Sequence, residues 1–293
     1  MKSISFHDQI SRNKRKSIFL IFVILLVLIL LSYVIGLIYP DYFFIILILG
    51  IIISLSYILT SYYNSDKIAL ASVNAKPASY EKHRQIHNIV EGICLASGLP
   101  KPKIYILEDK QINAFATGRD PKHSVICLTT GAIEKLDKQE LEGVIGHELS
   151  HISNYDIRFM TLVTVMVGMI AIISQIFLRS LWFSGNRNRN KSNAIIMIIG
   201  IVLAILAPLV VTIVQMTISR KREYVADASS VKFIRSPTGL IRALKKIKQE
   251  HEPMKVSGAV SPLFISDPLK KKLSGLFQTH PPINKRIEVL ERM

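Results

Sequence analysis

The stretch LDKQELEGVIGHELSHI, residues 136–152, carries the signals that decide the fold of the centre of the chain. Asp137 can cap the start of a helix, and Glu140, three residues later, completes a capping box. Apolar residues then recur three or four positions apart, at Leu141, Val144, Ile145, Leu149 and Ile152. This spacing is typical of a helix that packs one face on a core. The stretch therefore predicts a capped, half-buried helix.

Within the same helix, His147 and His151 are four residues apart, and Glu148 directly follows the first histidine. Residues at this spacing lie one turn apart on one helix face, so both imidazoles can reach a single zinc ion at the ~2.0–2.1 Å that zinc–nitrogen bonds need. The Glu148 carboxylate then points beside the ion, where it can take a proton from a zinc-bound water. This His-Glu-x-x-His pattern predicts a zinc site with Glu148 as the catalytic base.

A catalytic zinc takes three protein ligands and keeps one open position for water. The candidate third ligand is Glu223, at the start of a predicted helix, and Asp227 follows one turn later on the same face. A carboxylate at position 227 could accept the outer N–H of a liganding histidine and fix its tautomer. A Glu-x-x-x-Asp pair on a basic helix is usually a solvated surface pair, so this assignment depends on the histidine motif upstream.

Four long runs contain no Asp, Glu, Lys or Arg: residues 18–39, 42–65, 159–178 and 192–219. A bilayer core of about 30 Å is crossed by about 20 helical residues. We expect residues 1–65 to form an N-terminal transmembrane hairpin and residues 66–293 to form a zinc metallopeptidase domain. A second hydrophobic helical hairpin, residues 159–219, is inserted between the histidine motif and Glu223. The basic residues Lys14–Lys16 before the first run place this end of the chain, and the active site, on the cytoplasmic side of the cell membrane.

The second hydrophobic hairpin leaves two alternatives. Glu223 must reach the same zinc as His147, so the chain has to be on the same side of the membrane before residue 159 and after residue 219. Either two membrane spans or none would satisfy this condition. The link between the two runs carries four basic residues, which the positive-inside rule disfavours on an outer face. These residues are Arg179, Arg187, Arg189 and Lys191.

The remaining segments have mixed, soluble composition and predict an α+β domain. Helical spacing covers residues 80–96, and the short β-rich runs 103–107 and 124–128 predict a small sheet. Further helices are expected at residues 236–248 and after Pro282. The fold class is therefore a mainly α integral membrane protein with a zincin-like α+β metalloprotease domain.

The net charge of +16 invites a nucleic-acid-binding interpretation, which the sequence does not support. No Lys/Arg stripe interleaved with aromatic residues, as a nucleic-acid-binding surface requires, occurs in the soluble segments. The two cysteines, Cys94 and Cys127, give no disulfide framework and no Cys-x-x-Cys spacing, and they are expected to be small buried residues. Nucleic acid is therefore not an expected partner.

Several segments resemble, in order along the chain, the HtpX-type heat-shock membrane proteases, in the zinc peptidase family that also holds the Ste24 CAAX-processing enzymes. The matching segments are NAFATG (113–118), TTG (129–131), GHELSH (146–151) with Asn154 and Asp156, Arg-x-x-Glu-x-x-Ala-Asp with Glu223 and Asp227, and HPP (280–282) with Arg286. The resemblance covers nearly the whole chain.

The resemblance implies one zinc ion held by His147, His151 and Glu223, with Glu148 as base. It also implies that His280 and Arg286 steady the oxyanion of the tetrahedral intermediate, a task that needs a donor near the developing charge. The segment that resembles the family's substrate-binding edge strand consists of Asn113, Ala114, Phe115, Ala116 and Thr117. An exposed strand edge offers backbone groups to any extended peptide.

The function predicted on these grounds is proteolysis of misfolded or damaged membrane proteins, with polypeptides as substrates and the lipid bilayer as surroundings. Two alternatives remain. A membrane scaffold with structural zinc would close the fourth zinc position and would have no use for a free carboxylate such as Glu148. Specific CAAX-type processing is disfavoured because the relatives that perform it carry more membrane spans around a large chamber. The sequence leaves the oligomeric state open.

Overall fold

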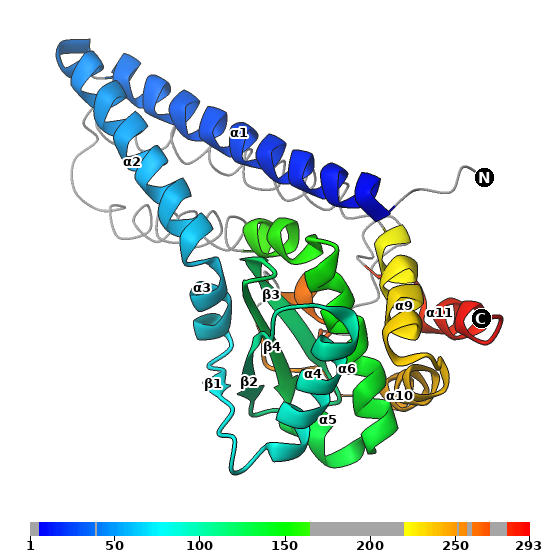
Figure 1. Ribbon diagram of the computed structural model, residues 1–293. Helices are drawn as coiled ribbons and strands as arrows, with labels where there is room; N and C mark the ends of the chain where they lie inside the picture. The colour runs from blue at the N-terminus through cyan, green and yellow to red at the C-terminus, as the bar shows by residue number, and fades with distance from the viewer. Residues whose placement is uncertain (1–5, 39, 165–219, 251, 257–259, 270–279) are drawn as a thin grey trace.

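The computed structural model describes residues 6–38, 40–164, 220–250, 252–256, 260–269 and 280–293. In these ranges helices dominate, and one small sheet lies in the middle of the chain (Figure 1). Most of the predicted second hydrophobic hairpin, from residue 165 to 219, falls outside the described residues. Its first residues, 159–164, continue a helix that starts at residue 156.

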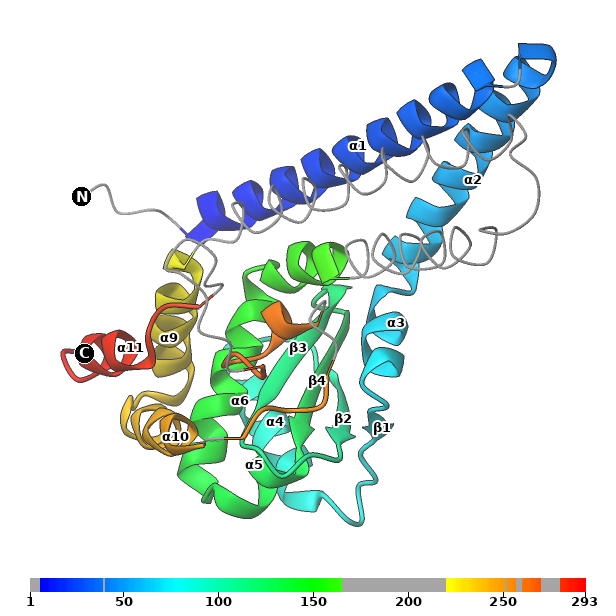
Figure 2. The same cartoon turned by 180° about the vertical axis from the view of Figure 1, so that it is seen from behind.

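The N-terminal segment forms a long helical hairpin of α1 (Phe6–Ile38) and α2 (Phe43–Tyr63), joined through a short 3-10 turn at Pro40–Tyr42. The hairpin extends well beyond the sheet and its helices in both views (Figures 1 and 2). Among the described residues, one helix, Pro40–Tyr63, is long and apolar enough to cross a membrane. The second predicted span, residues 42–65, overlaps this helix. The first predicted span, residues 18–39, overlaps α1, which ends at Ile38, and its crossing of the membrane stays a prediction.

The sheet has four strands in the order β1-β2-β4-β3. β2 and β4 are parallel, and the other two pairings are antiparallel. The predicted strands at 103–107 and 124–128 are confirmed as β2 and β4. The strands are β1 (Lys76–Pro77), β2 (Lys103–Leu107), β3 (Ala114–Asp120) and β4 (His123–Thr129).

Side chains alternate between the two faces of this sheet, as the pleat of a strand requires. On β4, Ile126 and Leu128 join the main core beneath helices α4 (Arg84–Ser97) and α6 (Lys138–Ser153), whereas Val125 and Cys127 join a second core. Phe115 of β3 packs in that second core with Phe264. Both faces of β3 and β4 are therefore buried, and the buried Cys127 fills space as the sequence predicts.

The helices around the sheet agree closely with the sequence. The predicted helix at 80–96 is α4, which ends at Gly98 in a left-handed conformation, and the capping box of Asp137 and Glu140 starts α6. The predicted helix at 236–248 is α10. The helical bounds are α3 (Ser65–Ser72), α4 (Arg84–Ser97), α5 (Thr130–Lys135), α6 (Lys138–Ser153), α9 (Lys221–Ile234), α10 (Thr238–Gln249), η2 (Ser261–Leu263) and α11 (Ile283–Leu290).

Glycine allows α6 to approach α10 at backbone distance. A Cβ atom on Gly143 would lie 2.4 Å from the backbone nitrogen of Leu240 and 2.7 Å from its Cα. Because both clashes are with backbone, no side chain can rotate away to relieve them. This contact fixes α6, which carries the histidine motif, against the C-terminal helices.

We expect the substitution Gly143→Ala to destabilise the protein by about 1–3 kcal/mol, since added volume in a packed interface forces the backbone to shift. Gly92→Ala is the matched control. Its Cβ meets nothing within 4 Å, so replacing a mid-helix glycine there should stabilise α4 by roughly 0.5–1 kcal/mol. Thermal unfolding in detergent measures both, and equal midpoints for the two variants would contradict the close contact.

Candidate metal centre

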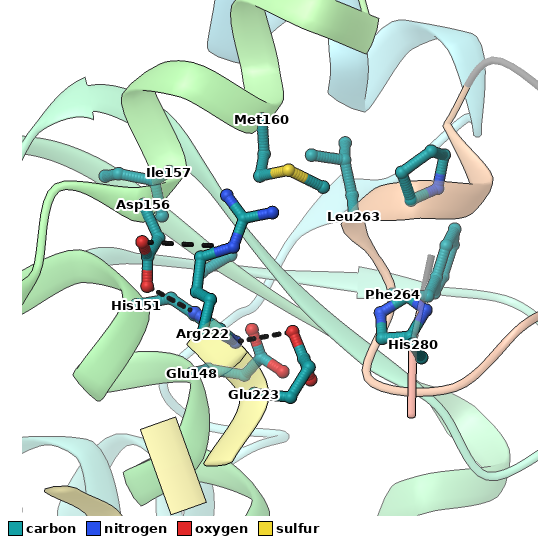
Figure 3. A pocket seen from close by; sticks show the side chains of 12 residues that line it. Glu148, His151, Asp156, Ile157, Met160, Arg222, Glu223, Leu263, Phe264 and His280 are labelled. Carbon is teal, nitrogen blue, oxygen red and sulfur yellow. Dashed lines mark hydrogen bonds and ion pairs between the residues drawn. The ribbon is translucent and has the colours of Figure 1, made fainter. Parts of the chain in front are cut away.

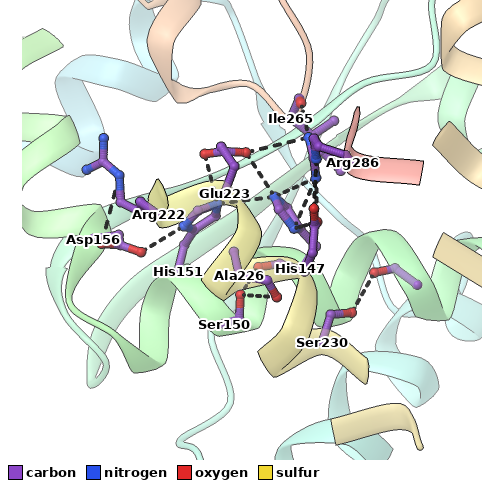
Figure 4. A network of polar contacts seen from close by, with 12 residues as sticks. His147, Ser150, His151, Asp156, Arg222, Glu223, Ala226, Ser230, Ile265 and Arg286 are labelled. Atoms are coloured by element: carbon purple, nitrogen blue, oxygen red, sulfur yellow. Dashed lines mark hydrogen bonds and ion pairs between the residues drawn. The ribbon is translucent and has the colours of Figure 1, made fainter. Parts of the chain in front are cut away.

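Two helices bring three ligand-type side chains to one buried point. α6 supplies His147 and His151, and α9 supplies Glu223 (Figure 4). The two Nε2 atoms are 3.2 Å apart, and Glu223 carboxylate oxygens lie 3.5 Å from His147 Nε2 and 3.7 Å from His151 Nε2. Ligand atoms about 2.0–2.1 Å from a tetrahedral zinc are separated by about 3.4 Å. The three side chains therefore form a cluster that fits a zinc ion.

Glu148 lies beside this cluster and is fully enclosed. Its side chain is 1% exposed, and neither carboxylate oxygen has a hydrogen-bond partner within the described part of the chain. A buried carboxylate without donors is costly, because burial penalises its charge. A nearby cation and a hydrogen-bond donor would offset this cost. A bound metal ion would supply the first, and a water molecule on it would supply the second.

The outer nitrogen of His147 is held by a buried pair of charges. Nδ1 of His147 lies 2.9 Å from Asp227 Oδ1, and Arg286 donates to both Asp227 oxygens at 2.9 and 2.7 Å. All three side chains are at most 1% exposed. Asp227 thus lies where the sequence analysis places it, and the bidentate guanidinium neutralises it while it orients the imidazole.

The outer nitrogen of His151 is held by a carboxylate to which the sequence analysis assigns no role. Asp156 Oδ2 lies 3.0 Å from His151 Nδ1. The five-residue separation does not correspond to one face of a helix. Asp156 reaches back because the chain turns at Tyr155, whose φ of 58° is in the left-handed region. In the sequence, Asp156 is indicated only by the resemblance to the family, in which Asn154 and Asp156 match residues that follow the histidine motif.

The enclosure and the surrounding charges shift several pKa values. Burial raises the pKa of Glu148, and the neighbouring His147 and His151 offset part of this rise. Burial also raises the pKa of Glu223, but His280 and the two ligand histidines outweigh it and hold the pKa well below its usual value. Burial and Arg286 lower the pKa of His147, yet the Asp227 and Glu223 carboxylates outweigh both and raise it to about 9. These shifts favour an ionised Glu223 carboxylate and, without a metal, a His147 imidazolium with a proton on each ring nitrogen.

A cavity of about 20 Å³ opens beside Glu148, His151 and Glu223 (Figure 3). This volume holds about one water molecule. The polar wall also includes His280, which the sequence analysis links to the reaction. The other lining residues are Ala116, Asp156, Ile157, Met160, Arg222, Pro262, Leu263 and Phe264.

The predicted substrate-binding strand is β3, which ends the sheet, but its edge is partly covered. The backbone N–H of Ile265 donates to the carbonyl of Ala114 at 2.9 Å, and Phe264 forms an isolated antiparallel β-bridge with Phe115. Nearer the strand end, Gly118 N–H donates to Thr161 Oγ1. Between these contacts, Ala116 lines the cavity.

The other members of the predicted strand are occupied elsewhere. Asn113 donates through its side chain to the carbonyl of Ser266, and the Thr117 hydroxyl is 2.9 Å from that of Thr161. Of the five predicted substrate residues, the structure therefore brings Ala116 to the cavity. Arg286 is likewise absent from the cavity walls given above, since its guanidinium is buried against Asp227 and His147.

The proton on His147 has a measurable consequence for metal binding. Because a histidine must be neutral to ligate zinc, binding below pH 9 has to release this proton. We expect about one proton released per zinc at pH 7, and an affinity that rises roughly tenfold per pH unit from pH 7 to about 9. Calorimetry in buffers of different ionisation enthalpy counts the protons. Zinc binding without proton release would show that His147 is already neutral.

Comparison with known proteins agrees with this arrangement. Peptidase family M48 matches residues 80–293. The "Protease HtpX homolog" of Caldanaerobacter subterraneus is 48% identical over 239 residues, covering 80% of each protein, and that of Dictyoglomus thermophilum is 42% identical over 297 residues, covering 100% of this chain and 96% of the relative. The crystal structure of S. mikatae Ste24p shares the fold, with a TM-score of 0.52 at 17% identity, and is matched over 89% of this chain and 62% of its own length. The chain belongs to peptidase family M48.

Proposed function

We propose that this chain is a zinc endopeptidase of the cell membrane that degrades misfolded or damaged membrane proteins. The observation that carries the proposal is the buried carboxylate of Glu148. It lies next to three ligand-type side chains, and the cavity between them has room for one water-sized group. A structural metal site has no use for such a carboxylate and closes its fourth position with another side chain.

His147, His151 and Glu223 would hold a zinc ion, which would supply Lewis acidity to polarise the scissile carbonyl and lower the pKa of water. Glu148 takes a proton from the attacking water and then delivers it to the leaving amine. Its raised pKa suits this exchange, because the carboxyl must hold the proton briefly before transfer. His147, His151 and Glu223 hold the metal, and Asp227 keeps the His147 imidazole in the ligating tautomer.

His280 and Arg286 are proposed to support the oxyanion in different ways. His280 lines the cavity and can donate a hydrogen bond to a developing negative charge. The Arg286 guanidinium lies 3.5 Å from a Glu223 carboxylate oxygen and donates a hydrogen bond to Asp227. These contacts favour an indirect role, in which Arg286 adds positive charge near the oxyanion and holds Asp227 in its orientation. The substrate main chain is proposed to pair with the β3 edge at Ala116.

Location in the membrane is supported by the surface of the N-terminal hairpin. Large apolar side chains are exposed along both helices, among them Phe22 and Leu30 on α1 and Phe44 and Ile53 on α2. A contiguous exposed apolar surface of this kind suits contact with lipid. The basic residues Lys14–Lys16 are at the same end of α1 as the metal centre, and under the positive-inside rule this supports an active site on the cytoplasmic side.

Substitution of the proposed base tests the reaction. We expect Glu148→Gln to lower zinc-dependent cleavage of casein by about 10²- to 10⁴-fold, since general-base catalysis is lost, while zinc content stays unchanged. The matched control is Glu142→Gln on the same helix, a partly exposed residue paired with Lys138. It should cleave like the native chain. Equal activity of native protein and Glu148→Gln would support the scaffold function instead.

The proposed orientation predicts which residues are reached from outside the cell. Asp41 and Arg15 are both exposed, at opposite ends of the hairpin, and the native Cys94 and Cys127 are buried. In intact cells a membrane-impermeant maleimide should label Asp41→Cys, whereas Arg15→Cys should react only after lysis. The reverse pattern would place the active site on the outer face.

A further inference from the structure

The N-terminal helix reaches the metal centre through one side chain, Asn13. Although α1 is the predicted membrane anchor, Asn13 is only 8% exposed. Its Nδ2 donates to Asp156 Oδ1 at 2.6 Å and to the backbone carbonyl of Asn154 at 3.0 Å. The two partners lie immediately after α6, in the turn that brings Asp156 back towards His151.

These contacts form a continuous path from α1 to a metal ligand. Asp156 is 1% exposed and uses its two oxygens differently: Oδ1 accepts from Asn13, and Oδ2 faces His151 Nδ1 at 3.0 Å. Among the described residues, the ion-pair partner of Oδ1 is Arg222, whose Nε is 4.0 Å away, beyond hydrogen-bond distance. Within the same part of the chain, the Asn13 amide is the side-chain donor that hydrogen-bonds Oδ1.

The path is held in place by one face of α1. Asn13, Ser17, Leu20 and Ile24 are buried at spacings of three and four residues. Leu20 and Ile24 pack with Phe159 and its neighbours in a small apolar cluster, and Lys14 lies over the ring of Tyr155 at 4.5 Å. The start of α1 accordingly lies next to α6 and α9 in both views (Figures 1 and 2).

We propose that Asn13 is a positioning residue of the metal centre. It fixes Asp156 so that the carboxylate orients His151, and through this contact the membrane helix α1 becomes a component of the metal site as well as an anchor. Groups that orient a metal-ligating histidine are known to change metal affinity by about 10- to 100-fold when removed. The inference rests on the proposed function only in requiring that the site binds zinc.

The test measures zinc affinity, so that it does not depend on proteolysis. Full-length protein in detergent carries Glu148→Gln to prevent self-cleavage, and the Kd for Zn²⁺ is measured by competition with a chromophoric chelator. Asn13→Leu keeps the side-chain volume but removes the donor, and we expect zinc binding to weaken about 10- to 100-fold. Ser17→Ala is the matched control on the same buried face: its hydroxyl donates to the Asn13 carbonyl within α1, so its Kd should stay within about twofold of the parent.

A double-mutant cycle separates positioning from packing. If Asn13 acts through Asp156, Asn13→Leu should have no further effect on Kd in an Asp156→Ala background, which lacks the acceptor, whereas independent effects would add. Asn13→Ala should lose as much affinity as Asn13→Leu, because both lack the donor.

Three results would overturn the inference. They are an unchanged Kd for Asn13→Leu, a full additive loss in the double variant, or a loss in Asn13→Ala that leucine restores. A parent chain that binds no zinc at all would overturn the proposed function together with it. If zinc binding weakens as expected but the chain with native Glu148 does not cleave casein, the inference is supported and the proposed function is contradicted.

Discussion

The structure depends on one constraint: two imidazoles and a carboxylate from separate helices must converge within a few ångströms inside a buried core. Charged and polar groups are costly to bury unless each finds a partner. The outer side of the cluster meets this requirement through Asp227 with Arg286 and through Asp156 with Asn13. The inner side faces the proposed metal position, and Glu148 lies there with no donor among the described residues.

The convergence requires α6 to lie close to α9, and small side chains make this possible. Ser150 of α6 donates to the carbonyl of Ala226 on α9, and Ser230 of α9 donates to the carbonyl of Gly143 on α6 (Figure 4). At Gly146, directly before the first histidine, an added Cβ would lie 2.5 Å from Ile234. The small residues around the candidate ligands therefore allow the two helices to approach each other closely.

Side chains of the described residues leave only a small cavity beside the candidate metal centre, and the segment around Phe264 covers part of the β3 edge. Room for about one water lies between the ligands and an apolar wall that includes Met160, Leu263 and Phe264. The segment that carries Phe264 also pairs with β3 through Ile265. An extended polypeptide that used the whole β3 edge would have to displace this pairing, whereas the Ala116 unit faces the cavity directly.

Local sequence signals predict several of the helices and strands, and they supply the hypothesis of zinc chemistry. Capping at Asp137, the helical spacing after it and the His147–His151 pair act within a few residues, so local rules predict α6 and two ligands, and β2, β4, α4 and α10 follow from their own periodicity. Glu223 and Asp227 lie far along the chain, and a Glu-x-x-x-Asp pair is a weak signal by itself, so their assignment depends on the histidine motif upstream. Only the tertiary structure decided that Asp156 turns back to His151, that Asn13 of the N-terminal helix reaches Asp156, and that Arg286 lies behind His147. The contacts of Asn13 with Asp156 and of Arg286 with His147 join residues more than a hundred positions apart, which leave no periodicity in the sequence. The contact of Asp156 with His151 is local, but it depends on the left-handed turn at Tyr155, which no helical spacing predicts.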